Sequence, residues 1–179
     1  MKKLLSNFFI FTGIFFVIIS IALYWQSNNP NRLKFDNYVA PQGTQIVNEV
    51  SQPVRLIIPN LDIDLAVIPA EKTGDKWPTT SQGVSYLNSS PVPGEVGNSI
   101  LYGHNWASIL GNLRQAVPGH QIVIAYADGS TKVFEVINIQ KVDPNQTEVL
   151  NQTGDARITL YTCTGFLDRE RLVVTAKLL

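Results

Sequence analysis

The chain opens with a long apolar run, which differs from everything that follows it. Residues 8–25 (FFIFTGIFFVIISIALYW) are 18 residues without a charge. As a helix rising about 1.5 Å per residue, this run would extend about 27 Å, close to the hydrocarbon thickness of a bilayer. Tyr24 and Trp25 stand at its end, where interfacial aromatic residues are common. The pattern predicts a transmembrane anchor at residues 8–25, preceded by a short tail of residues 1–7.

A cleaved signal peptide is the alternative interpretation of this run. The apolar core of a signal peptide usually has about 7–15 residues, and no small-x-small cleavage pattern precedes the polar Gln26. The sequence therefore favours an uncleaved anchor. Lys2 and Lys3 favour a cytoplasmic N-terminus, against Arg32 and Lys34 close beyond the other end of the run. The remainder of the chain is then expected outside the cell membrane, in an extracellular position.

After the apolar run, the composition and the spacing of apolar residues change twice. Residues 26–52 are polar, contain several Asn, Pro and Gly, and show no sustained helical or strand period, which predicts an extracytoplasmic linker. Residues 45–50 could add a short strand to the following domain. From residue 53 onward, short β-rich runs alternate with turn signals, and only residues 108–116 have the apolar spacing of a helix. The pattern predicts one all-β domain over residues 53–179, either a sandwich or a closed barrel.

The predicted strands are rich in β-branched and apolar residues. They are residues 54–58, 65–68, 99–102, 121–126, 132–139, 158–162 and 172–178. Residues 127–131, with Gly129 at their centre, are expected to join two of these strands as a hairpin. No internal repeat and no low-complexity tract interrupts the pattern.

Composition and charge narrow the classes of function. With 45% hydrophobic and 16% charged residues, the chain can bury an ordinary core. Its formal net charge is zero, and without Lys2 and Lys3 twelve basic residues stand against fourteen acidic ones with no basic run. This balance argues against nucleic-acid binding. The single cysteine excludes an internal disulfide and a Cys-rich metal site.

That cysteine lies between the last two predicted strands. If these strands pair as antiparallel neighbours, Cys163 and Arg171 come together at one rim of the sheet. Arg169 has the same parity as Arg171 and is two residues nearer to Cys163. Arg171 is preferred because the apolar strand follows it at once. A lone cysteine at a strand end is often only a small buried hydrophobic residue, so its neighbours decide whether it is reactive.

A reactive thiol needs a nearby base or cation, and the chain offers two histidines. His104 follows the predicted strand at residues 99–102 and a glycine, so it too stands at a strand end. His120 begins the next strand. A thiol with a pKa near 8.5 is mostly protonated at neutral pH, and a nearby imidazolium or guanidinium stabilises the reactive thiolate. Either histidine could serve, and the pattern slightly favours His104, which also has Trp106 close enough to contact a substrate.

Four segments deserve to be compared together: residues 54–59 (VRLIIP), 97–104 (GNSILYGH), 159–163 (TLYTC) and 171–174 (RLVV). They resemble segments of the sortase family, the membrane-anchored cysteine transpeptidases of bacterial cell surfaces. Residues 159–163 (TLYTC) match the TLxTC signature, and residues 97–104 (GNSILYGH) are similar to the segment that carries the catalytic histidine. Residues 171–174 (RLVV) resemble the start of the final strand, and residues 54–59 (VRLIIP) resemble the opening strand. The matches follow the expected order, and the N-terminal anchor fits as well. The resemblance implies a closed β-barrel of about eight strands with one or two short helices.

The resemblance also implies roles for individual residues. Cys163 would be the nucleophile, His104 the general acid and base, and Arg171 the group that stabilises substrate and oxyanion. Thr162, just before the cysteine, would help to shape the substrate groove. His120 stands where the family more often has an acidic or polar residue, which disfavours it.

The implied reaction is a transpeptidation. An LPxTG-like sorting signal of an exported protein would be cleaved through a thioester, and its acyl group would pass to an amine of a cell-wall precursor or of a protein lysine. The reaction needs no metal and no other cofactor. Asp62 and Asp64 could bind calcium, as nearby acidic residues do in some sortases, although two carboxylates more often belong to a solvated loop.

Three other functions stay open at this point. A cysteine hydrolase would use the same three residues. A non-catalytic anchored β-domain, such as an adhesin or a scaffold, would explain the anchor and the strands but not the occurrence of Cys163, His104 and Arg171 together. An exported redox or metal protein is weaker, because one cysteine offers no resolving thiol and two histidines offer no evident ligand set.

Overall fold

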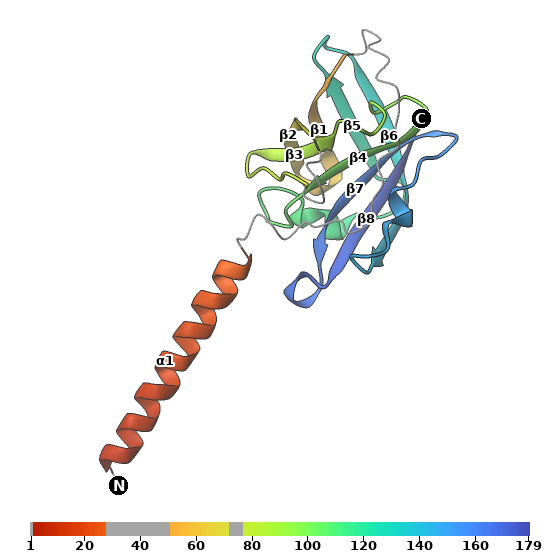
Figure 1. Ribbon diagram of the computed structural model, residues 1–179. Coiled ribbons are helices and arrows are strands. Elements are labelled where there is room, and N and C mark those ends of the chain that lie inside the picture. The colour runs from red at the N-terminus through yellow and green to blue at the C-terminus, as the bar shows by residue number, and fades with distance from the viewer. Residues whose placement is uncertain (1, 28–50, 72–76) are drawn as a thin grey trace. The chain divides into compact units, whose positions relative to one another are not determined.

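The computed structural model describes residues 2–27, 51–71 and 77–179 (Figure 1). The chain divides into two compact units, Met1–Arg32 and Leu33–Leu179. The first contains helix α1 (Lys2–Ser27), whose segment Asn7–Gln26 has the length and apolar composition needed to cross a membrane. This helix is consistent with the expected anchor. Residues 28–50, which hold most of the predicted linker and the expected short strand, lie outside the described residues.

Within the described part of the second unit, eight strands close into a barrel, so the predicted fold class is confirmed. The order of the strands around the barrel is β1-β2-β3-β4-β7-β8-β6-β5. Two neighbouring pairs are parallel, β2 with β3 and β4 with β7, and the other pairs are antiparallel. The strands are β1 (Pro53–Ile58), β2 (Ile63–Ala70), β3 (Gly83–Leu87), β4 (Gly97–Gly103), β5 (Gln121–Tyr126), β6 (Thr131–Val142), β7 (Ala156–Thr164) and β8 (Glu170–Leu178).

Strand β3 is absent from the strands predicted from the sequence. It has only five residues, and its position depends on a parallel pairing with β2 that joins Val67 to Val84. A side chain at Gly83 would overlap the carbonyl oxygen of Ala66, so the glycine permits the close approach of the two strands. A pairing of this kind leaves no local hydrophobic pattern long enough to identify the strand.

The short helices of the described residues are all of the 3-10 type. The segment expected to be helical at residues 108–116 contains η3 (Gly111–Gln115), which is one short 3-10 turn rather than an α-helix. Its apolar positions are nevertheless buried, as the spacing predicted: Ile109, Leu110 and Leu113. The other short helices are η2 (Pro59–Leu61), η4 (Thr147–Leu150) and η5 (Phe166–Asp168). The described residues thus contain four short helices where one or two were expected.

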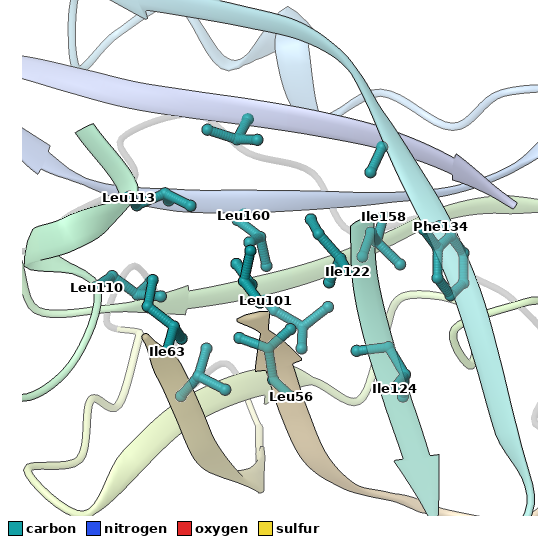
Figure 2. Close-up of a cluster of buried hydrophobic side chains, with 14 of the residues drawn as sticks. Leu56, Ile63, Leu101, Leu110, Leu113, Ile122, Ile124, Phe134, Ile158 and Leu160 are labelled. Atoms are coloured by element: carbon teal, nitrogen blue, oxygen red, sulfur yellow. The ribbon is translucent and has the colours of Figure 1, made fainter. Parts of the chain in front are cut away.

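Two apolar clusters organise the barrel. The first fills its interior with alternate residues from the strands, including Leu56, Ile122 and Leu160 (Figure 2). The second lies on the opposite face of β4 and β7, since its members there alternate with the interior residues. It comprises Ala70, Trp77, Leu87, Ile100, Tyr102, Val142, Leu150, Tyr161, Cys163 and Val173. We call the first the inner cluster and the second the outer cluster. The only cysteine, Cys163, therefore belongs to the outer cluster.

We expect the inner cluster to carry much of the stability. Leu160 is completely buried between neighbouring strands, so Leu160→Ala should lower the free energy of unfolding by about 2–5 kcal/mol through lost burial and a cavity. Urea unfolding of the full chain in detergent, followed by tryptophan fluorescence, would measure this loss. Leu179→Ala is the matched control, because Leu179 is 69% exposed and its truncation should change little. Equal unfolding midpoints for the two variants would contradict the prediction.

Candidate active site

Strands β7 and β8 place Cys163 directly opposite Arg171. The two residues are partners in the antiparallel register, which continues along both strands to Arg157 and Lys177. The predicted pairing of the cysteine with Arg171 is therefore confirmed. Arg169 lies outside the paired strands, at the end of η5, and its side chain is exposed. The loop between the strands is thus long enough to carry Arg169 away from the register position that faces Cys163.

Strand β4 brings His104 to the other side of the cysteine. It runs parallel to β7, with Tyr102 beside Tyr161 and Gly103 beside Thr162. The next position in this register places His104 beside Cys163. Neighbouring strands lie about 4.8 Å apart, so the backbones that carry the histidine and the arginine are separated by about 10 Å, with the cysteine strand between them.

His120 occupies a different part of the barrel. It precedes β5, whose first residue Gln121 pairs with Glu135, and Glu135 pairs in turn with Lys177. Lys177 is six residues beyond Arg171 in β8, which corresponds to about 20 Å along an extended strand. The topology therefore brings His104, and not His120, to the end of the barrel that holds Cys163.

An aromatic side chain covers the imidazole of His104. The ring stacks on the indole of Trp106 with a centroid distance of 4.2 Å and an interplanar angle of 7°. The backbone of this segment is also fixed, because the amide of Leu110 donates to the carbonyl of His104 at 3.0 Å. The histidine is only 6% exposed. Sequence spacing placed Trp106 near His104 but gave no sign of the stacked geometry.

The guanidinium of Arg171 is held by the loop that precedes it. Its Nη1 donates to the carbonyl of Asp168 at 2.8 Å and to the carbonyl of Glu170 at 3.0 Å. Burial raises the pKa of Tyr161, and the positive charge of Arg171 opposes this rise, which shows that the guanidinium lies close to the phenol. Tyr161 and Cys163 belong to the same apolar cluster, and Arg171 lies opposite Cys163 in the register, so the three side chains share one environment.

Thr162 faces away from this environment. It is 1% exposed, and its hydroxyl donates to the carbonyl of Gly103 at 2.8 Å. This bond joins the strand of the cysteine to the strand that leads into His104. The side chain is therefore enclosed between β4 and β7, a position that suits the alignment of the two strands, and its expected part in a substrate groove stays a prediction.

The three side chains together can support nucleophilic chemistry. Cys163 is 4% exposed and Arg171 is 5% exposed, so both side chains lie where little water reaches them. A guanidinium stabilises a neighbouring thiolate and any oxyanion that forms beside it, and an imidazole can transfer protons to and from a reacting group. The arrangement has the components of a cysteine nucleophile with an acid and base on one side and a fixed cation on the other.

The aspartates suggested for calcium lie at the start of β2. Both carboxylate oxygens of Asp64 accept hydrogen bonds from Arg55, each at 2.6 Å, in an exposed ion pair. Asp62 is the left-handed residue that ends η2. Among the described residues, no group of three or more His, Cys, Asp and Glu side chains could hold a metal ion. The calcium site stays a prediction from the sequence alone.

Comparison with known proteins relates this fold to one family. Residues 56–179 match the family model of the Sortase domain. A search of curated proteins found no match to the chain.

Similar solved structures include sortase A from Corynebacterium diphtheriae, with 26% identity and a TM-score of 0.61 over 72% of this chain and 61% of that one. Sortase C1 from Streptococcus agalactiae has 26% identity and a TM-score of 0.61 over 72% of this chain and 69% of that one. Sortase C-1 from Actinomyces oris has 28% identity and a TM-score of 0.57 over 72% of this chain and 75% of that one. The chain thus spans about three fifths of the length of the C. diphtheriae enzyme. Since the family match covers more than two thirds of the chain and the barrel has the fold of these enzymes, the chain belongs to the sortase family.

Proposed function

We propose that the chain is a cysteine transpeptidase that cleaves a sorting signal of an exported protein and transfers its acyl group to an amine. The observation that carries this proposal is the strand register, which sets Cys163 between Arg171 and the segment of His104. Membership of the sortase family supports the same reaction class. The anchor at the N-terminus would keep the enzyme at the membrane with its barrel outside the cell, where exported substrates and cell-wall precursors pass.

The first half of the proposed reaction forms an acyl-enzyme. The thiolate of Cys163 attacks the carbonyl carbon of the scissile peptide bond, and Arg171 stabilises the resulting oxyanion. When the C–N bond breaks, protonated His104 donates its proton to the departing amine. The products are a thioester on Cys163, a neutral histidine and a released peptide with a new amino terminus.

The second half restores the enzyme. Neutral His104 accepts a proton from the incoming amine as the amine attacks the thioester carbonyl. Collapse of the second oxyanion expels the thiolate of Cys163 and leaves a new amide. The same steps with water in place of the amine would release a free acid, so the acceptor alone separates transpeptidase from hydrolase. An LPxTG-like signal and a cell-wall or lysine amine are proposed from the family resemblance.

The proposed reaction is tested with the full chain in detergent. A library of LPxTG-like peptides is incubated with triglycine, and mass spectrometry follows the products of the wild type and of a Cys163→Ala control. A ligated peptide that requires Cys163 would support a transpeptidase and would reveal its preferred motif. Cleavage without ligation would favour a hydrolase, and the absence of product and of any Cys163 adduct would favour a non-catalytic anchored domain.

The role of Arg171 predicts a sharp contrast with Arg169. Arg171→Ala should lower kcat about 10²–10³-fold, because the oxyanion loses its fixed cation. Arg171→Lys should recover little, since a single ammonium cannot reproduce the planar guanidinium held by two backbone carbonyls. Arg169→Ala is the matched control and should stay within about twofold of wild type. Steady-state kinetics measure the contrast, and a larger loss in the Arg169 variant would reverse the assignment.

The stacked indole predicts a smaller effect at Trp106. Trp106→Ala should lower kcat about three- to tenfold, because the imidazole loses the aromatic face that restricts its rotation. Trp106→Phe keeps an aromatic face and should retain most of the activity. Parallel kcat measurements over a range of pH would show the effect. Equal activity of the alanine variant and the wild type would exclude a contribution of the stack.

A further inference from the structure

The loop between β7 and β8 adopts an unfavourable backbone conformation directly beside the candidate active site. Leu167 and Asp168 both have φ near 55°, in the left-handed region that side chains other than glycine rarely occupy. Gly165, two positions before Leu167, has φ 78°. Two consecutive strained residues persist only where the surrounding structure holds them, and such strain is common at functional sites.

Two of the hydrogen bonds at Asp168 connect this loop to residues on opposite sides of the cysteine. The side-chain amide of Asn105 donates to the carboxylate Oδ1 of Asp168 at 3.0 Å. The backbone carbonyl of Asp168 accepts from Nη1 of Arg171 at 2.8 Å. Asn105 directly follows His104 in the chain. One residue of the strained loop is therefore connected to the histidine segment by its side chain and to the arginine by its backbone.

We propose that Asn105 and Asp168 are a pair of positioning residues, which together fix the imidazole of His104 and the guanidinium of Arg171 relative to Cys163. The inference rests on the proposed transpeptidase function, because it concerns the same three side chains. Neither residue is assigned contact with the reacting atoms. Their bond links the segment that follows β4 and carries His104 to the loop between β7 and β8 that leads to Arg171.

The barrel itself does not depend on this bond. Strands β4, β7 and β8 are already aligned by their backbone ladders, and Thr162 adds a bond from β7 to Gly103. Loss of the Asn105 to Asp168 bond therefore leaves the strand register in place and frees only the two loops that follow β4 and β7. A small displacement of catalytic groups can reduce turnover severely without preventing folding.

Kinetics of the full chain in detergent test the pair. Asn105→Ala and Asp168→Ala are each expected to lower kcat about tenfold, with KM changed less than about twofold and with little change in Tm. Asp168→Asn should stay within about threefold of wild type, because its amide oxygen still accepts the bond from Asn105. The double alanine variant should lose no more than either single variant, since both remove one interaction. Arg169→Ala, in the same loop, is the matched control.

A second measurement needs no substrate. Relaxation of the ¹⁵Nε–H group of Arg171 reports the order of its guanidinium, which should fall in both alanine variants and persist in Asp168→Asn. Unchanged order and kcat in the alanine variants would overturn the proposal. Additive losses in the double variant, or an Asp168→Asn variant as impaired as Asp168→Ala, would do so as well. If the wild type transfers no peptide, the proposed function fails, while the order of Arg171 still decides whether the pair positions it.

Discussion

Replacing Cys163 with alanine is expected to abolish cleavage and transfer together. The thiolate is the only group of the proposed site that can form the covalent acyl-enzyme, so its loss should reduce kcat/KM more than about 10⁴-fold. Cys163→Ser should be nearly as inactive, because a hydroxyl is far harder to deprotonate than a thiol and the neighbouring guanidinium cannot close that gap. Residual turnover would have to come from the remaining binding and polar groups alone.

The acyl-enzyme itself provides the direct measurement. Wild-type chain quenched in acid during turnover should carry the mass of the acyl fragment on the peptide that contains Cys163, and neither variant should carry it. Cys163 is a small member of the outer apolar cluster, so Cys163→Ala should leave the barrel folded, and a thermal unfolding transition near that of the wild type is the control. Product formation by a folded Cys163→Ala variant would refute the covalent mechanism.

The pairing of Cys163 with Arg171 could be predicted from the sequence because the two residues lie on strands that follow each other directly in the chain. Two adjacent β-rich runs joined by one loop form an antiparallel pair, and strand parity then restricts which residues can face each other. The parity alone could not separate Arg171 from Arg169. The structure separates them because the register continues without a shift from Thr164 and Glu170 to the far end of both strands.

The choice between His104 and His120 could not be made from local pattern. His104 follows one β-rich run and His120 precedes another, and only the parallel pairing of β4 with β7 brings one of them to Cys163. That pairing joins strands separated by more than fifty residues, including β5 and β6, so no short segment encodes it. The family resemblance supplied this information where periodicity did not.

The hydrogen bond between Asn105 and Asp168 could not be predicted from the sequence for a different reason. The bond from Asn105 to Asp168 requires two consecutive left-handed residues in a loop without a glycine at either position. Left-handed backbone conformations are rare for leucine and aspartate, so the conformational propensities of these residues do not predict them. The bond from the Thr162 hydroxyl to the carbonyl of Gly103 depends on the parallel pairing of β4 with β7, which no local pattern encodes.

The second large effect is expected at His104. His104→Ala should lower kcat about 10²–10⁴-fold, because both the departure of the first amine and the attack of the second need a proton transfer at this position. Added imidazole should restore part of the activity, since truncation vacates a ring-sized site against the face of Trp106. His120→Ala is the matched control, and it should keep wild-type activity because its strand lies far from Cys163 in the register.

The pH dependence adds a test that a loss of folding could not imitate. A histidine that donates a proton in one half-reaction and accepts it in the other must be available in both protonation states, so wild-type turnover should fall at low and at high pH. In His104→Ala supplied with a series of substituted imidazoles, the rate should follow the pKa of the added base, which identifies proton transfer as the missing function. A rescue that ignores this pKa would indicate that the ring only fills space. A loss of activity in His120→Ala with full activity in His104→Ala would move the acid and base to the other side of the barrel and contradict the strand register on which the proposed mechanism depends.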